Sequence, residues 1–175
     1  RGIEVGLISM NAALSACGRA SNWTEALELL LAAEVETLQP SLISFSAAIS
    51  ACERGSEWEV ALSLFQDMQS LVITPNTISW SAAISACEKG GNWQLALHFL
   101  SATKGKADVI CYSAAISACE KGSQWSKALD ILHGMPSRHC TPNVISYNAA
   151  ISACENAEHW EEAINLLEIL RRQKL

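Results

Sequence analysis

Apolar residues fall in two consecutive helical patterns along much of the chain. Four of them occupy positions i, i+3, i+4 and i+7 of one stretch: Phe45, Ala48, Ile49 and Cys52. This spacing places one apolar stripe on an α-helix. A second stripe begins at Trp58 and continues at the same spacing to Met68. The pattern predicts two helices in succession.

Glycine, serine and proline residues indicate where these helices end. Gly55 is the expected helix stop and Ser56 a candidate N-cap for the next helix. We therefore expect helices at residues 44–54 and 57–69. A proline dipeptide then ends the second helix, because proline cannot continue it. The dipeptide recurs as Pro40-Ser41, Pro75-Asn76 and Pro142-Asn143.

The same segment recurs five times. The copies read LISMNAALSAC, LISFSAAISAC, TISWSAAISAC, VICYSAAISAC and VISYNAAISAC, and they start at Leu7, Leu42, Thr77, Val109 and Val144. Their offsets are 35, 35, 32 and 35 residues. One helix pair cannot bury its own stripes, but stacked pairs can. The sequence thus predicts an all-α protein, an α-solenoid of about five helix-turn-helix repeats in an elongated superhelix.

The offsets also set the expected repeat boundaries. They are 1–6 as the tail of a preceding repeat, then 7–41, 42–76, 77–108, 109–143 and 144–175 for repeats 1 to 5. Repeat 3 is three residues short, and Gly134 and Pro136 should end the second helix of repeat 4 early. The chain does not start with Met and starts like the tail of a repeat, so we expect a fragment with an incomplete repeat 5. Stripes exposed at its ends predict possible self-association.

Composition adds limits on function. The formal net charge of −6 argues against a generally basic nucleic-acid binder. No apolar run reaches the length of about 18 residues that a membrane helix needs. We find no nucleophile–base pair, glycine-rich phosphate loop or metal-ligand spacing, so we expect no enzyme activity, no cofactor or metal, and no small-molecule substrate. The four His residues share no register and are expected at the surface.

Cysteine and tryptophan each form a column across the repeats. One cysteine ends each copy of the segment, and a tryptophan follows six residues later. The columns are Cys17, Cys52, Cys87, Cys119 and Cys154, and Trp23, Trp58, Trp93, Trp125 and Trp160. We expect both to be buried, the cysteines as small reduced residues and the tryptophans as packing between repeats rather than platforms for nucleobases.

The repeat motifs resemble those of the pentatricopeptide repeat family. The resemblance rests on the 35-residue period, an opening V-x-[ST]-[YF]-N-x-x-I, a W-x-x-A-L second helix and a closing T-P-[ND]. It covers essentially the whole chain. It implies a right-handed superhelix whose first helices bind single-stranded RNA, one base per repeat. It also implies organellar RNA processing or expression in a mitochondrion or chloroplast.

The resemblance assigns roles to three columns of residues. The first reading column follows the aromatic of each first helix: Asn11, Ser46, Ser81, Ser113 and Asn148. The second reading column closes each repeat: Ser41, Asn76, Asp108 and Asn143. The third column would wedge between bases: Ile8, Ile43, Ile78, Ile110 and Ile145. Taken in register, the pairs predict the sequence 5′-C-A-G-A-[CU]-3′.

A basic column stands eight residues after the first reading column and would contact phosphates: Arg19, Arg54, Lys89 and Lys121. Each of the four columns also has a plainer interpretation. The polar residues are also good helix caps, the isoleucines could be core, and the cations also suit helix C-termini.

A column of glutamates lies next to the basic column: Glu53, Glu88, Glu120 and Glu155. These carboxylates would face bound phosphate. Two hypotheses therefore stand: a sequence-specific single-stranded RNA-binding module, and a protein-binding α-solenoid scaffold without an RNA ligand.

Overall fold

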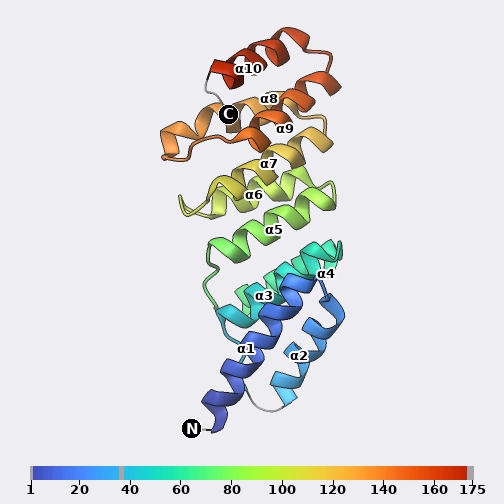
Figure 1. Ribbon diagram of the computed structural model, residues 1–175, viewed down its shortest axis with the longest axis vertical. Coiled ribbons are helices and arrows are strands. Elements are labelled where there is room, and N and C mark those ends of the chain that lie inside the picture. Colours follow the sequence, from blue (N-terminus) through green and yellow to red (C-terminus); the bar gives the residue numbers. More distant parts are fainter. Residues whose placement is uncertain (1, 36–37, 173–175) are drawn as a thin grey trace. The chain divides into compact units, whose positions relative to one another are not determined.

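The computed structural model is helical throughout and has no strand in the residues it describes, 2–35 and 38–172 (Figure 1). Arg1, residues 36–37 and residues 173–175 belong to the predicted tail, repeat 1 and repeat 5 and lie outside the described residues. The helices are α1 (Gly2–Ala20), α2 (Trp23–Val35), α3 (Leu42–Arg54), α4 (Trp58–Ser70), α5 (Thr77–Lys89), α6 (Trp93–Ala102), α7 (Val109–Lys121), α8 (Trp125–Gly134), η1 (Pro136–Arg138), α9 (Val144–Asn156) and α10 (Trp160–Arg172).

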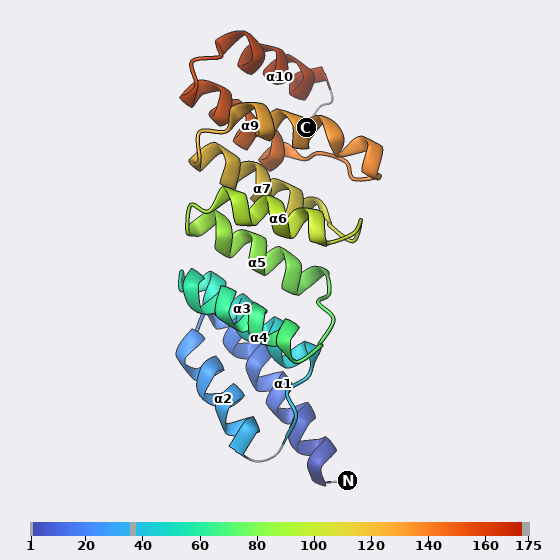
Figure 2. The ribbon, with the colours of Figure 1, turned by 180° about the vertical axis from the view of Figure 1, so that it is seen from behind.

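The chain divides into two compact parts, Arg1–Ala86 and Cys87–Leu175, with the boundary inside α5. In the first part, α1 packs beside α3, and α2 contacts both of them. In the second part, α7 packs beside α9, and α8 contacts both (Figure 2). Each part is therefore built the same way: first helices of successive repeats lie side by side, and a second helix bridges them.

The predicted helices of repeat 2 are confirmed to within two residues at each end. The turn between them differs from the prediction. Ser56 adopts the left-handed conformation, with φ of 68°, and the N-cap position of α4 belongs to Glu57. The backbone N–H of Glu57 donates to the carbonyl of Cys52 at 2.9 Å, which closes the helix end. The prediction that Ser56 is the N-cap is therefore wrong.

Gly55 has an ordinary helical φ of −71°, so the backbone conformation does not require a glycine at this position. A Cβ there would stand 2.5 Å from Cδ1 of Trp23 in the preceding repeat. The same collision, with Trp93, would follow a side chain at Gly122. Both glycines let the tryptophan of one repeat pack on the helix end of the next.

The tryptophan column packs between repeats but is not buried as predicted. Four of its rings are half-buried and Trp160 is 65% exposed. Side chains of the next repeat also contact two of these rings. Nζ of Lys127 lies 3.8 Å from the ring centre of Trp93, and the ring centres of His159 and Trp125 are 3.8 Å apart. His159 is therefore half-buried, while the other three histidines are exposed as expected.

The cysteine column lies in the core, apart from the half-buried Cys17. All seven cysteines are free thiols, as a reduced chain requires. Burial raises the pKa of Cys52 to about 11 and that of Cys87 to about 12.

The early end predicted for the second helix of repeat 4 is confirmed, because α8 stops at Gly134 and is followed by a single 3-10 turn. In the shorter repeat 3, α6 stops at Ala102. Helix α1 starts at Gly2, five residues before the repeat boundary at Leu7. No helix in the described part of the chain has the length and apolar character to cross a membrane. Self-association through end faces such as Ile164 and Leu167 of α10, both exposed, stays a prediction.

Candidate nucleic-acid interface

The isoleucine column is exposed along the whole chain. The exposed fractions are 68% for Ile8, 56% for Ile43, 59% for Ile78, 57% for Ile110 and 62% for Ile145. Isoleucine is among the residues most often fully buried, so five exposed copies at one register are not chance. The interpretation of these side chains as core is excluded, and the first helices carry a repeating row of exposed apolar side chains.

The closing residues of the repeats are helix N-caps. Oδ1 of Asn76, Asp108 and Asn143 accepts the backbone N–H of the residue three positions on, each at 2.9 Å. Ser41 occupies the N-cap position of α3. The capping interpretation is thus correct for this column. It does not exclude base reading, because the cap uses one oxygen and leaves the other end of the amide or carboxylate for a ligand.

The structure brings the two reading columns into contact. The hydroxyl of Ser46 lies 3.4 Å from Oδ1 of Asn76, and that of Ser113 lies 3.4 Å from Oδ1 of Asn143. These are the pairs that the register assigned to bases two and four. The serine hydroxyls are largely buried, whereas Asn148 is exposed. A base would therefore meet chiefly the closing residue in repeats 2 and 4.

A serine column that sequence reasoning missed holds the closing residues in place. Oγ of Ser79 accepts the backbone N–H of Asn76 at 2.9 Å, and Oγ of Ser146 accepts that of Asn143 at 2.8 Å. Ser44 stands at the same register, and its hydroxyl donates to Oδ1 of Asn11 at 2.7 Å. The signal was in the sequence, since a capping residue followed by serine three positions on is a capping box.

The basic column is partly engaged with the preceding repeat. Nη1 of Arg54 donates to the carbonyl of Gly18 at 3.1 Å, at the end of α1. Lys121 forms an ion pair with Glu88, with Nζ and Oε1 2.7 Å apart. Both bonds join neighbouring first helices, so these cations stabilise the stack. Further donors remain on each, because a guanidinium carries five N–H groups and an ammonium three.

The glutamates lie among these cations. Burial raises the pKa of the Glu120 carboxyl, the nearby Lys121 lowers it and Glu88 raises it further. Pairing as in Glu88–Lys121 means that a glutamate offsets a cation of the next repeat, which the sequence interpretation did not foresee. The signal for this pairing in the sequence was that the acidic and basic columns are adjacent and recur in every one of repeats 2 to 4.

The negative charge of the protein is concentrated on the second helices. Their described side chains include eight acidic and three basic residues, whereas those of the first helices include four of each. The net charge of −6 therefore does not describe the surface that carries the reading columns. That surface is close to neutral.

Residues of all four predicted columns line one open hollow of about 310 Å³ in the first part of the chain. Its walls include a reading pair, two wedge residues and two cations: Ser46, Asn76, Ile43, Ile78, Arg19 and Arg54. Small residues of α1 and α3 form the rest, among them Ser15, Gly18 and Ala47. The residues that the family resemblance singles out in this part of the chain therefore lie around one hollow.

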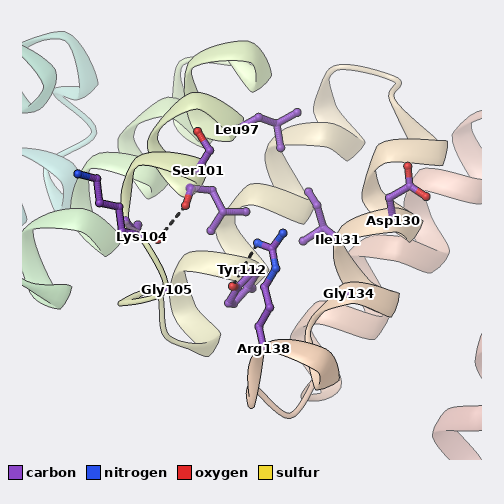
Figure 3. Close-up of a pocket in the computed structure, with 11 residues that line it drawn as sticks. Leu97, Ser101, Lys104, Gly105, Tyr112, Asp130, Ile131, Gly134 and Arg138 are labelled. Carbon is purple, nitrogen blue, oxygen red and sulfur yellow. Dashed lines mark hydrogen bonds between the residues drawn. The ribbon is translucent and has the colours of Figure 1, made fainter.

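A larger hollow of about 650 Å³ lies in the second part, between α6 and α8. Figure 3 shows Arg138 reaching toward Tyr112, with Leu97 and Ile131 nearby. The guanidinium nitrogen Nη1 lies 3.5 Å from the Tyr112 hydroxyl. No residue of the reading, wedge or basic columns lines this hollow. It is therefore separate from the candidate interface.

These features define an α-solenoid of helix-turn-helix repeats, and the candidate interface lies on its first helices. Family models match nearly the whole chain: the PPR repeat family at residues 107–156, the pentatricopeptide repeat domain at 1–54, and the PPR repeat at 43–71, 78–104 and 145–175. The chain belongs to the pentatricopeptide repeat family. A comparison with curated protein sequences gave no match.

Solved structures share the fold at low sequence identity. The PPR domain of Arabidopsis thaliana protein-only RNase P 1, in complex with tRNA, is 14% identical with a TM-score of 0.84, covering 97% of this chain and 91% of that one. Maize PPR10 is 23% identical with a TM-score of 0.68, covering 97% of this chain and 25% of that one. PPR10 in complex with an 18-nt psaJ RNA element is 20% identical with a TM-score of 0.71, at 97% and 29% coverage. The chain thus spans about a quarter of the PPR10 chain.

Proposed function

We propose that the protein is a single-stranded RNA-binding module that reads one base per repeat. The observation that carries the proposal is the hollow of the first part, where the reading pair, the wedge residues and the cations of separate columns come together. Two similar structures, PPR10 and protein-only RNase P 1, are complexes with RNA, which supports the class of ligand. The role in organellar RNA processing or expression is proposed from the family alone.

The chemistry of the columns fits bases better than a protein surface. Exposed isoleucines at 59% for Ile78 and 57% for Ile110 offer flat apolar contact between successive bases. An Asn that caps through Oδ1 keeps its NH₂ for an acceptor on adenine, while an Asp keeps an oxygen for the N1–H of guanine. Asp108 retains the cap of α7 despite the short repeat 3. It stands in the same position relative to α7 as Asn143 does to α9.

The test is a change of base at one position. Asp108→Asn should shift the third base from guanine to adenine, and Asn143→Asp should shift the fourth from adenine to guanine. Asp and Asn are equally good N-caps, so neither change should lower stability. A good base contact discriminates by about 1–3 kcal/mol, or roughly five- to 150-fold.

The preferred base at each position is measured by selection from random single-stranded RNA pools, with the unaltered protein and with each of the two variants. The proposal predicts reciprocal shifts at bases three and four and no change elsewhere. Unchanged selections for both variants would show that the closing residues do not read bases. Failure of all three proteins to enrich any sequence would favour the scaffold hypothesis, which the paired cation Lys121 and the acidic second helices also support.

A further inference from the structure

The second helices of the first part form a separate apolar hollow of about 430 Å³. It lies between α2 and α4, and its walls include Leu27, Leu31, Phe45, Leu64, Leu71 and Asp67. Leu31 is 61% exposed and Leu71 is 56% exposed, although a leucine of a packed helix pair is normally covered. No residue of the reading, wedge or basic columns lines this hollow.

The residue after Leu71 is strained as well as exposed. Val72 is 88% exposed and adopts φ of 57°, in the left-handed region. A β-branched residue is unusual there, and the conformation costs about 1–2 kcal/mol. The equivalent turn positions in repeats 3 and 4 carry Lys104 and His139, which suit an exposed turn. Val72 gains no burial in the fold to offset its strain, so its side chain is placed for contact outside the fold.

The charge around this hollow has one sign. Helices α2 and α4 contain no Lys or Arg. Glu28 is three residues before Leu31 on the same helix face, and Asp67 lines the hollow itself. Glu25 and Glu59 are exposed on the same two helices. This surface repels a phosphate backbone and attracts a basic partner.

We propose that the hollow between α2 and α4 binds a basic amphipathic helix of a partner protein. Leucine-type side chains at i, i+3 or i+4, and i+7 of the partner would fill the hollow and cover Leu31, Leu71 and Val72. Lysine or arginine residues on its flanks would face Glu28 and Asp67. The site lies on second helices and is independent of RNA binding by the first helices.

The probe for the experiment is a labelled synthetic helix of about 18 residues, long enough to be helical when bound. It carries leucines along one face and lysines on both flanks; a second peptide carries glutamates in place of the lysines. Fluorescence anisotropy should show that the basic peptide binds at least about tenfold more tightly, and that its affinity falls with salt. Equal binding of the two peptides would overturn the proposal.

Two variants and a matched control locate the site. Val72→Asn should weaken binding of the basic peptide about three- to tenfold. The melting temperature of the protein should stay the same or rise, because Asn tolerates the left-handed conformation. Asp67→Asn should flatten the salt dependence. Ile78→Ser, an exposed isoleucine of the first helices, should leave peptide binding unchanged and weaken RNA binding.

Peptide affinity unaffected by both Val72→Asn and Asp67→Asn would refute this location. Loss of RNA binding in Ile78→Ser is judged separately. If Ile78→Ser binds RNA as well as the unaltered protein does, that result counts against the RNA function but not against the docking site.

Discussion

The ion pair between Glu88 and Lys121 gives a direct test of where RNA lies. Its atoms are 2.7 Å apart, and the side chains are 23% and 46% exposed. Glu88→Gln removes the charge but keeps an oxygen that can accept from the Lys121 ammonium. An exposed pair of this kind contributes about 0–1 kcal/mol, so stability should fall little. The variant therefore changes the charge of the interface without changing its fold.

The expected gain in RNA affinity follows from Coulomb's law. A carboxylate about 6 Å from a phosphate, at an effective dielectric constant of about 40–80, repels it by about 0.7–1.4 kcal/mol. Removing the charge should tighten binding about three- to tenfold. If Lys121 then pairs with a phosphate, the slope of log affinity against log salt should steepen by about 0.7.

Filter binding at several salt concentrations measures both quantities. The matched control is Glu161→Gln, which removes the same charge from an exposed position on the second helix α10. Equal tightening in both variants would mean that only the net charge matters. No change of affinity or slope in Glu88→Gln would show that phosphates do not pass this pair, and the placement of RNA along the first helices would be wrong.

Three further predictions concern stability, each measured by urea unfolding. Gly122→Ala should cost about 1–3 kcal/mol because its Cβ collides with Trp93, whereas Gly134→Ala, which has open space around it, should not destabilise; equal effects would reject the collision. Glu158→Gly should stabilise by about 1 kcal/mol, since Glu158 has φ of 61°, and a loss of stability would contradict this. Burial raises the pKa of Cys87 from its ordinary value of 9.0 to about 12. The unfolded thiol loses its proton first, so this stabilisation is complete below pH 9 and lost as pH rises toward 12; a flat profile there would count against burial.

Features that repeat within one unit could be predicted from the sequence. The apolar stripes predicted the helices of repeat 2 to within two residues, and Gly134 and Pro136 predicted the early end of α8. The resemblance to the pentatricopeptide repeat family implied that Ser46 and Asn76 act as a pair, and the structure places them 3.4 Å apart. Periodicity succeeds here because each helix is defined by its own residues and by its own apolar stripe.

Features that depend on the next repeat could not be predicted in the same way. Gly55 was interpreted as a helix stop, but the contact that requires glycine comes from Trp23, 32 residues earlier. Burial of the tryptophans was overestimated for the same reason, because a stripe indicates a buried side and not how much of a large ring the neighbour covers. Pairing of Glu88 with Lys121 required knowing that the two columns face each other across adjacent helices.

The helix caps at Asn76, Asp108 and Asn143 limit how the proposed base specificity could be changed. Each of these side chains holds the N-terminus of the following first helix through Oδ1. Any residue placed there to recognise another base must also be able to cap, which limits the choice to Ser, Thr, Asn, Asp and Gly. A long or basic side chain would cost about 0.5–2 kcal/mol in each repeat altered. Under the proposed function, specificity can therefore be changed without loss of stability only among these five residue types, whereas non-capping residues at all four closing positions would together cost about 2–8 kcal/mol.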